Sequence, residues 1–174
     1  MLPTELTTLQ AFRGLAEPDA AQICEGLIHR EYSSGESVLT EGDDTQALWL
    51  ILSGECTVSR DSEQGERILA VLNSGDVFGE MSFVRNAPHS ASIIAATPLK
   101  VCCYKREDFL KLATERPEVG CIIATNIACV LAERLRRMDS WVCDMFERPE
   151  ILDGSGFRDE WQSFRSAVYT NWDF

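Results

Sequence analysis

The sequence predicts a mainly β fold with flanking helices, of the β jelly roll or double-stranded β-helix type. Between residues 29 and 106, short apolar runs alternate with glycines, and short strands punctuated in this way are typical of a sandwich or barrel. Segments with helical spacing of apolar residues lie before and after this region. Apolar residues make up 45% and charged residues 25% of the 174 residues, so we expect a packed globular core.

Two short N-terminal helices are expected within residues 4–27. Leu6, Leu9 and Phe12 recur at three-residue spacing, and Pro18 opens a second helical segment. Six strands should follow, separated by glycines at turn positions, where a positive φ angle costs least for this residue. The predicted strands are residues 37–40, 47–52, 55–59, 67–72, 91–96 and 100–105.

The segment 75–96 has the pattern of an anion-binding turn. A short helix is expected to start at Gly79, so that its first unpaired N–H groups and its positive dipole end face a bound anion. Glu80 is repelled by an anion unless it accepts a hydrogen bond from another part of the ligand, such as a sugar hydroxyl. The two features together predict a ribose-phosphate ligand. The alternative is a structural turn in which Glu80 only stabilises the helix start.

This segment resembles the phosphate-binding cassette of the cyclic-nucleotide-binding domain family, found in catabolite-activator-type regulators, kinase regulatory subunits and gated channels. Two further glycine signatures, at residues 35–43 and 53–55, also resemble that family, and the resemblance covers roughly residues 8–142. It implies the jelly-roll fold, with the short helix of the cassette and a long C-terminal helix. The matching cassette residues are Phe78, Gly79, Glu80, Met81 and Ser82, followed by Pro88, Ser90, Ala91, Ser92 and Ile93.

The resemblance also implies a ligand and its contacts. The ligand would be cAMP, cGMP or a related phosphate, with Glu80 accepting a hydrogen bond from the ribose 2′-hydroxyl. The family's base contact falls on the long helix, near Met138, Asp139 and Ser140. Neither a cofactor nor a metal is implied. The cyclic phosphate would be held by the backbone N–H groups of Gly79, Glu80, Met81, Ser82 and Ala91 and by the Ser90 hydroxyl.

His89 is the one consequential departure, because the family has a phosphate-clamping arginine at this position. Imidazole offers one donor and is mostly neutral near pH 7, whereas guanidinium is a permanently charged fork. Losing a charged hydrogen bond worth roughly 1.5–3 kcal/mol weakens binding about tenfold to a few hundredfold. A bound anion raises an imidazole pKa, so a His89 clamp predicts tighter binding at lower pH. Two interpretations stay open: a sensory module with weakened or altered ligand binding, and a ligand-free structural or interaction module.

Pro117 is expected to open a long helix that reaches about residue 145. An apolar seam along it has the narrow spacing of a coiled coil, and the resembling family uses this element for dimerisation, so we expect a homodimer. Packing of the helix against its own sheet is the alternative. The seam residues are Ile127, Leu131, Leu135, Met138 and Val142.

Two parts are expected along the chain: a cyclic-nucleotide-binding-like domain over residues 1–146, and a linker with an aromatic amphipathic tail over residues 147–174. Phe157, Trp161 and Phe164 lie at helical spacing in this tail. Exposed rings of this size are costly, so the tail should dock on its own domain, on the dimer mate or on another protein.

Several function classes are disfavoured. The 28 acidic and 16 basic residues give a net charge of −12, which repels nucleic acid. The seven cysteines form no Cys-x-x-Cys pair, and the two histidines lack metal-ligand spacing to them, so no metal site is expected. We find no catalytic constellation and expect no enzyme. Without a long apolar run or signal-peptide features, a cytoplasmic protein that does not enter membranes is expected.

Overall fold

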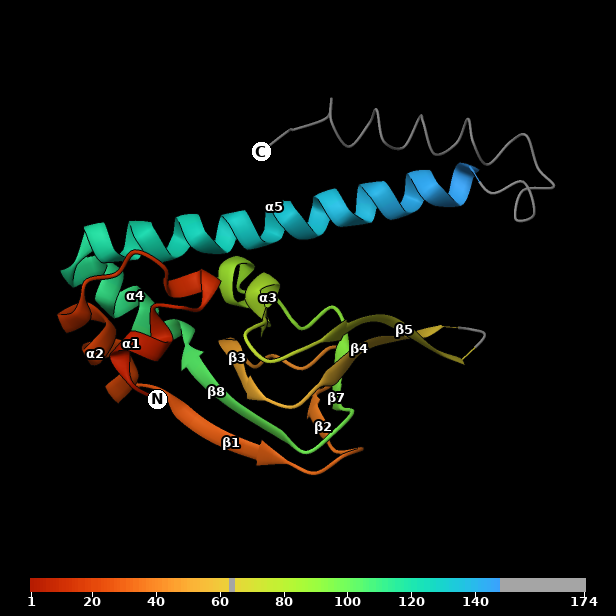
Figure 1. Cartoon of the computed structure of the whole chain (residues 1–174), viewed down its shortest axis with the longest axis horizontal. Coiled ribbons are helices and arrows are strands. Elements are labelled where there is room, and N and C mark those ends of the chain that lie inside the picture. The colour runs from red at the N-terminus through yellow and green to blue at the C-terminus, as the bar shows by residue number, and fades with distance from the viewer. Residues whose placement is uncertain (63–64, 148–174) are drawn as a thin grey trace. The chain divides into compact units, whose positions relative to one another are not determined.

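The structure of the chain, a computed structural model, describes residues 1–62 and 65–147 (Figure 1). The chain divides into two compact units, Met1–Leu131 and Ala132–Phe174. The first unit contains every strand of the described residues. The expected aromatic tail lies outside the described residues, so its docking and the domain boundary after residue 146 stay predictions.

The described strands form two four-stranded antiparallel sheets. The first sheet has the order β1-β8-β3-β6 and the second has the order β2-β7-β4-β5. Neighbours in these sheets are mostly far apart in sequence, as in a jelly roll. The strands are β1 (Ile28–Tyr32), β2 (Ser37–Leu39), β3 (Ala47–Ser53), β4 (Cys56–Ser62), β5 (Gly65–Leu72), β6 (Val77–Phe78), β7 (Ser92–Ala95) and β8 (Leu99–Lys105).

One apolar core lies between the two sheets. Side chains of β3, β6 and β8 from the first sheet meet side chains of β2, β4 and β7 from the second. Strand β3 is buried on both faces, which explains why its sequence is a continuous apolar run instead of an alternating one. This core includes Leu39, Trp49, Ile51, Cys56, Phe78, Ile93, Val101 and Cys103.

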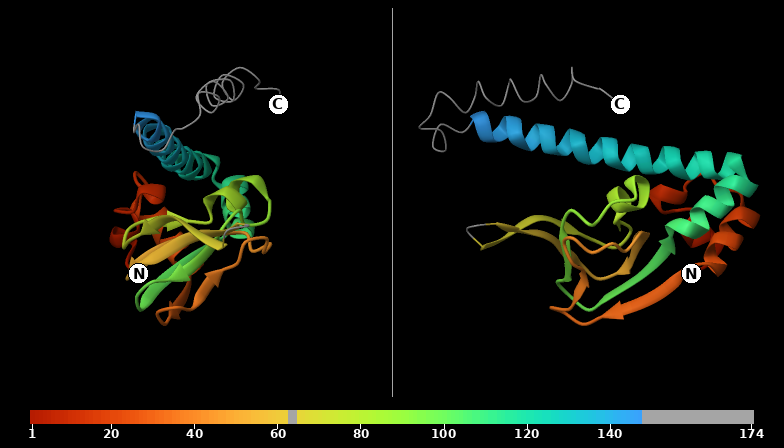
Figure 2. Two further views of the ribbon diagram at one scale, coloured as in Figure 1. Left: turned by 90° about the vertical axis from the view of Figure 1, so that its right-hand side faces the viewer. Right: turned by 180° about the vertical axis from the view of Figure 1, so that it is seen from behind.

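A second core joins the helices to the other face of the first sheet. Leu48 and Leu50 of β3 and Cys102 and Tyr104 of β8 pack there against helical side chains such as Ile123. Helices α1, α2 and α4 gather at one end of the strands (Figures 1 and 2). The helices are α1 (Pro3–Leu6), α2 (Glu17–Glu25), α3 (Glu80–Arg85), α4 (Arg106–Glu115) and α5 (Pro117–Glu147), with a 3-10 turn at Gln10–Phe12.

The predicted fold class is confirmed, with local differences. All six predicted strands are present within a few residues, but β1 and β6 were not anticipated as separate strands. Strand β1 is an edge strand whose three central residues are exposed, so its sequence has no apolar alternation, and β6 has only two residues. The apolar spacing of Leu6, Leu9 and Phe12 belongs to a one-turn helix and a 3-10 turn.

Candidate ligand-binding site

The turn from β6 into α3 requires glycine at position 79. Gly79 has a φ angle of +75°, in the left-handed region that residues with a Cβ atom rarely adopt. A Cβ atom there would lie 2.7 Å from the backbone oxygen of Ala47 and 3.0 Å from Cδ1 of Trp49. The Trp49 ring in turn stacks on Phe78, with centroids 5.7 Å apart. The start of α3 is therefore set closely against β3.

Helix α3 is fixed at both ends. The Phe83 amide donates to the Gly79 carbonyl oxygen at 3.0 Å, which closes the first turn. At the other end Asn86 adopts the left-handed conformation, and its amide donates to the Ser82 carbonyl at 3.0 Å. The guanidinium Nε of Arg106 donates to the Phe83 carbonyl at 2.8 Å. The N–H groups of a first helical turn have no intrahelical acceptors, so this turn fixes the direction in which they point.

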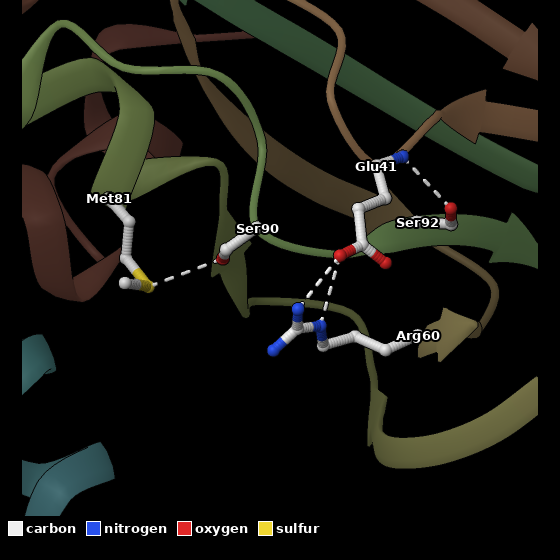
Figure 3. A network of polar contacts seen from close by, with 5 residues as sticks. All are labelled: Glu41, Arg60, Met81, Ser90 and Ser92. Atoms are coloured by element: carbon white, nitrogen blue, oxygen red, sulfur yellow. Dashed lines mark hydrogen bonds and ion pairs between the residues drawn. The ribbon is translucent and has the colours of Figure 1, made fainter. Parts of the chain in front are cut away.

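The two halves of the predicted cassette come together. Glu80 and Ser82 on α3 are buried, with 5% and 2% of their surface exposed, while Met81 is half exposed. The loop after α3 returns Ser90 to the same place, where its hydroxyl contacts the Met81 sulfur at 3.7 Å (Figure 3). A buried carboxylate at a helix start, with an exposed hydroxyl in contact with the next residue of that helix, suits a ligand with both hydroxyl and anionic groups.

His89 is buried in the cassette, with 6% of its surface exposed. Its Nδ1 atom lies 3.1 Å from the Ser82 hydroxyl. Its amide donates to the Asp43 carbonyl and its carbonyl accepts from the Gly42 amide, both at 2.9 Å. These contacts fasten the loop to the turn at residues 42–43. The resemblance gave this position a phosphate-clamping role, which stays a prediction.

Burial lowers the pKa of His89 below its usual value. The Thr45 backbone and the carboxylates of Asp43, Asp44 and Glu80 act in the opposite direction, but the cost of desolvating the charged imidazole is larger. The imidazole is therefore neutral near pH 7 in this structure. Its Nε2 atom is buried and has no hydrogen-bond partner of ordinary geometry among the described residues.

Sequence reasoning missed a second polar contact beside the cassette. The Arg60 guanidinium of β4 donates to the same Glu41 carboxylate oxygen at 2.9 Å and 3.1 Å (Figure 3). The Glu41 amide also donates to the Ser92 hydroxyl, at 3.0 Å. Glu41 and Arg60 are 19 positions apart with no motif joining them, so only the strand register could have shown that they meet.

The apolar seam predicted on α5 divides between two environments. Ile127 is buried in the helical core, and Leu131 packs partly against that core. Leu135 and Met138 are exposed, whereas the side chain of Val142 lies outside the description. The expectation of a dimer therefore depends on the exposed pair and stays a prediction. The base contact expected at Met138, Asp139 and Ser140, on the part of α5 in the second unit, is likewise untested.

Residues 1–62 and 65–147 hold no cluster of three or more His, Cys, Asp or Glu side chains arranged to bind a metal. Within the same residues, no helix has the length and apolar character needed to span a membrane. The cysteines differ in exposure: Cys56, Cys102 and Cys103 are buried, while Cys121 and Cys129 are exposed. Burial raises the pKa of Cys102 to about 12, which makes it a poor nucleophile.

Comparison with known proteins agrees with this architecture. The family model of the cyclic nucleotide-binding domain matches residues 29–116. The cyclic AMP receptor protein of Thermus thermophilus is 36% identical over 129 residues, which are 74% of this chain and 58% of that protein. A cAMP-dependent protein kinase regulatory subunit of Mycosarcoma maydis is 34% identical over 52% of this chain and 17% of the relative. This chain thus spans less than two thirds of the length of both relatives.

Among solved structures, a cyclic nucleotide-binding domain from Methylobacillus flagellatus superposes with a TM-score of 0.75. The alignment covers 88% of this chain and 84% of that one, at 24% identity. At this level of identity the likeness shows the fold alone.

Proposed function

The chain belongs to the cyclic nucleotide-binding domain family, and on this premise we propose that it is a regulatory module that binds cAMP, cGMP or a related phosphate ester. The observation that carries the proposal is the geometry of the cassette. Glu80 is buried next to the helix start at Gly79, and the loop from α3 brings the Ser90 hydroxyl back to Met81 on the same helix. The similarity to a cyclic AMP receptor protein and to a kinase regulatory subunit supports the ligand class.

We expect the chain to bind its phosphate ester more weakly than a chain with arginine at position 89 would. His89 is buried, neutral near pH 7 and already in contact with Ser82, so it offers a phosphate less charge than a guanidinium would. Replacing His89 by arginine should tighten cAMP binding at least tenfold, since a charged hydrogen bond is worth roughly 1.5–3 kcal/mol. If His89 is itself the clamp, wild-type affinity should rise from pH 8 to pH 6.

We further propose that occupancy is signalled through α5 in a cytoplasmic homodimer with no catalytic activity of its own. The exposed apolar side chains of Leu135 and Met138 support an association through this helix. The net charge of −12 argues against direct nucleic acid binding.

The test is calorimetric titration with cAMP, cGMP and 2′-deoxy-cAMP. The wild-type chain should prefer cAMP to its deoxy analogue, because Glu80 would accept a hydrogen bond from the 2′-hydroxyl. Glu80→Gln keeps the shape of this buried side chain but removes its charge, so it should weaken cAMP binding about tenfold and reduce that preference. Equal binding of the two nucleotides by both proteins would contradict the assigned role of Glu80.

A ligand-free structural or interaction module is the second candidate. The observation in its favour is that Ser82 and His89 contact each other, so that two polar side chains of the cassette are already paired. This candidate predicts no heat of binding with any of these nucleotides, no effect of Glu80→Ala and loss of self-association after substitution of Leu135 and Met138.

A further inference from the structure

The ion pair between Glu41 and Arg60 crosses the segment that leaves the cassette. Strand β7 lies between β2 and β4 in its sheet. Glu41 follows β2 on one side of β7, and Arg60 belongs to β4 on the other. Their side chains nevertheless meet, at 2.9 Å and 3.1 Å (Figure 3). The pair therefore spans the beginning of β7, directly after Ser90 and Ala91.

The alternation of side chains along β4 shows which face Arg60 occupies. Cys56 and Val58 point into the core between the sheets, so Arg60, two residues further on, lies on the same face. The β4–β5 ladder contains a bulge, but its extra residue is Leu69 on β5, which leaves the alternation of β4 intact. Arg60 thus projects from the inner face of the sheet, at the end of the strand where the cassette lies.

The register places Arg60 level with the cassette alanine. Ser59 is paired with Ser92 in the β4–β7 ladder, so the next residue, Arg60, lies beside Ala91. Ala91 is two residues before the buried Ile93 and therefore shares the inner face. Arg60 and Ala91 therefore lie on the same face of the sheet.

The ion pair between Glu41 and Arg60 is partly exposed, so an anionic ligand could reach the guanidinium. The Arg60 side chain is 56% exposed and the Glu41 side chain is 29% exposed, so neither is locked in the core. One Glu41 oxygen accepts both bonds from Arg60, and the other is buried without a hydrogen-bond partner among the described residues. The Glu41 carboxylate is therefore an anion bound by the Arg60 guanidinium beside the cassette.

We propose that the Arg60 guanidinium, and not His89, is the cation that binds a ligand phosphate. Glu41 is then an internal anion that competes with the phosphate for Arg60. This inference rests on the proposed function, because it assumes that a phosphate ester enters the cassette. The Nε and Nη2 groups of Arg60 both donate to one carboxylate oxygen, and a guanidinium donates equally well to a phosphate oxygen, so a ligand phosphate can take the place of Glu41.

The experiment is calorimetric titration of the full chain at one pH and salt concentration, with cAMP and with adenosine, which lacks the phosphate. Arg60→Gln should weaken cAMP binding about tenfold or more, and Glu41→Gln should tighten it by a similar factor. Neither change should alter the binding of adenosine. Matched controls are Lys100→Gln and Glu31→Gln, which make the same charge changes in an exposed ion pair of the other sheet and should leave cAMP binding unchanged.

The outcomes separate the two proposals. If Glu80→Gln weakens cAMP binding while Arg60→Gln does not, Arg60 is not the phosphate cation and the proposed function stands. If Glu41→Gln fails to tighten binding, the competition is refuted. If neither the wild-type chain nor Glu41→Gln binds cAMP or cGMP, both proposals fail. Thermal unfolding of each variant checks that the chain still folds.

Discussion

Replacing Gly79 by alanine should destabilise the fold far more than the same change at a glycine of similar conformation. The left-handed backbone costs an alanine about 1–2 kcal/mol. The new Cβ would also lie 2.7 Å from the Ala47 carbonyl oxygen and 3.0 Å from the Trp49 ring, and relieving such overlap costs about 1–3 kcal/mol more. We therefore expect a loss of about 2–5 kcal/mol for Gly79→Ala. Gly14 has a φ angle of +83° and open space at its Cβ position, so Gly14→Ala should lose only about 1–2 kcal/mol.

Urea unfolding followed by circular dichroism measures both losses, as shifts of the midpoint at an unchanged slope. The difference between the two variants isolates the contact with β3 from the backbone cost that they share. Equal losses would refute the close approach of the cassette to Ala47 and Trp49. A loss at Gly79 without weaker cAMP binding would show that this approach stabilises the fold but does not shape the site.

Three further predictions concern other parts of the chain. Burial lowers the pKa of His89 in the folded state, so the contribution of neutral His89 to stability is complete above its unfolded pKa of about 6.5 and is lost as the pH falls toward its folded pKa. The urea midpoint should therefore fall more between pH 7.5 and pH 5.5 for the wild type than for His89→Asn, and parallel profiles would contradict this. Leu135→Asp with Met138→Asp should lower the mass seen in sedimentation if the exposed seam of α5 makes a dimer; an unchanged mass would count against that dimer. Native alkylation at pH 8 should label the exposed Cys121 and spare Cys102, whose pKa burial raises to about 12, so labelling of Cys102 in mass spectra before unfolding would show that it is accessible.

The local patterns of the sequence were enough to predict much of this molecule. Short apolar runs between glycines predicted the strands, because turns with positive φ angles and buried alternate faces depend on residues close together in the chain. The glycine start of α3 and the acidic residue after it were predicted for the same reason, whereas the returning serine was expected from the family resemblance.

Only the tertiary structure decided which residues that are far apart in the sequence come into contact. Spacing alone did not show that Ile127 is buried in the core of its own domain, that His89 is enclosed between α3 and the turn at residues 42–43, or that Arg60 meets Glu41 across β7. The contact of Arg60 with Glu41 follows from strand order, whereas the other two follow from the packing of helices and loops against the sheets. In each case the residues that meet are far apart in the sequence, and no local pattern links them. The charge of a buried imidazole, in turn, depends on the atoms packed around it, and these come from several elements.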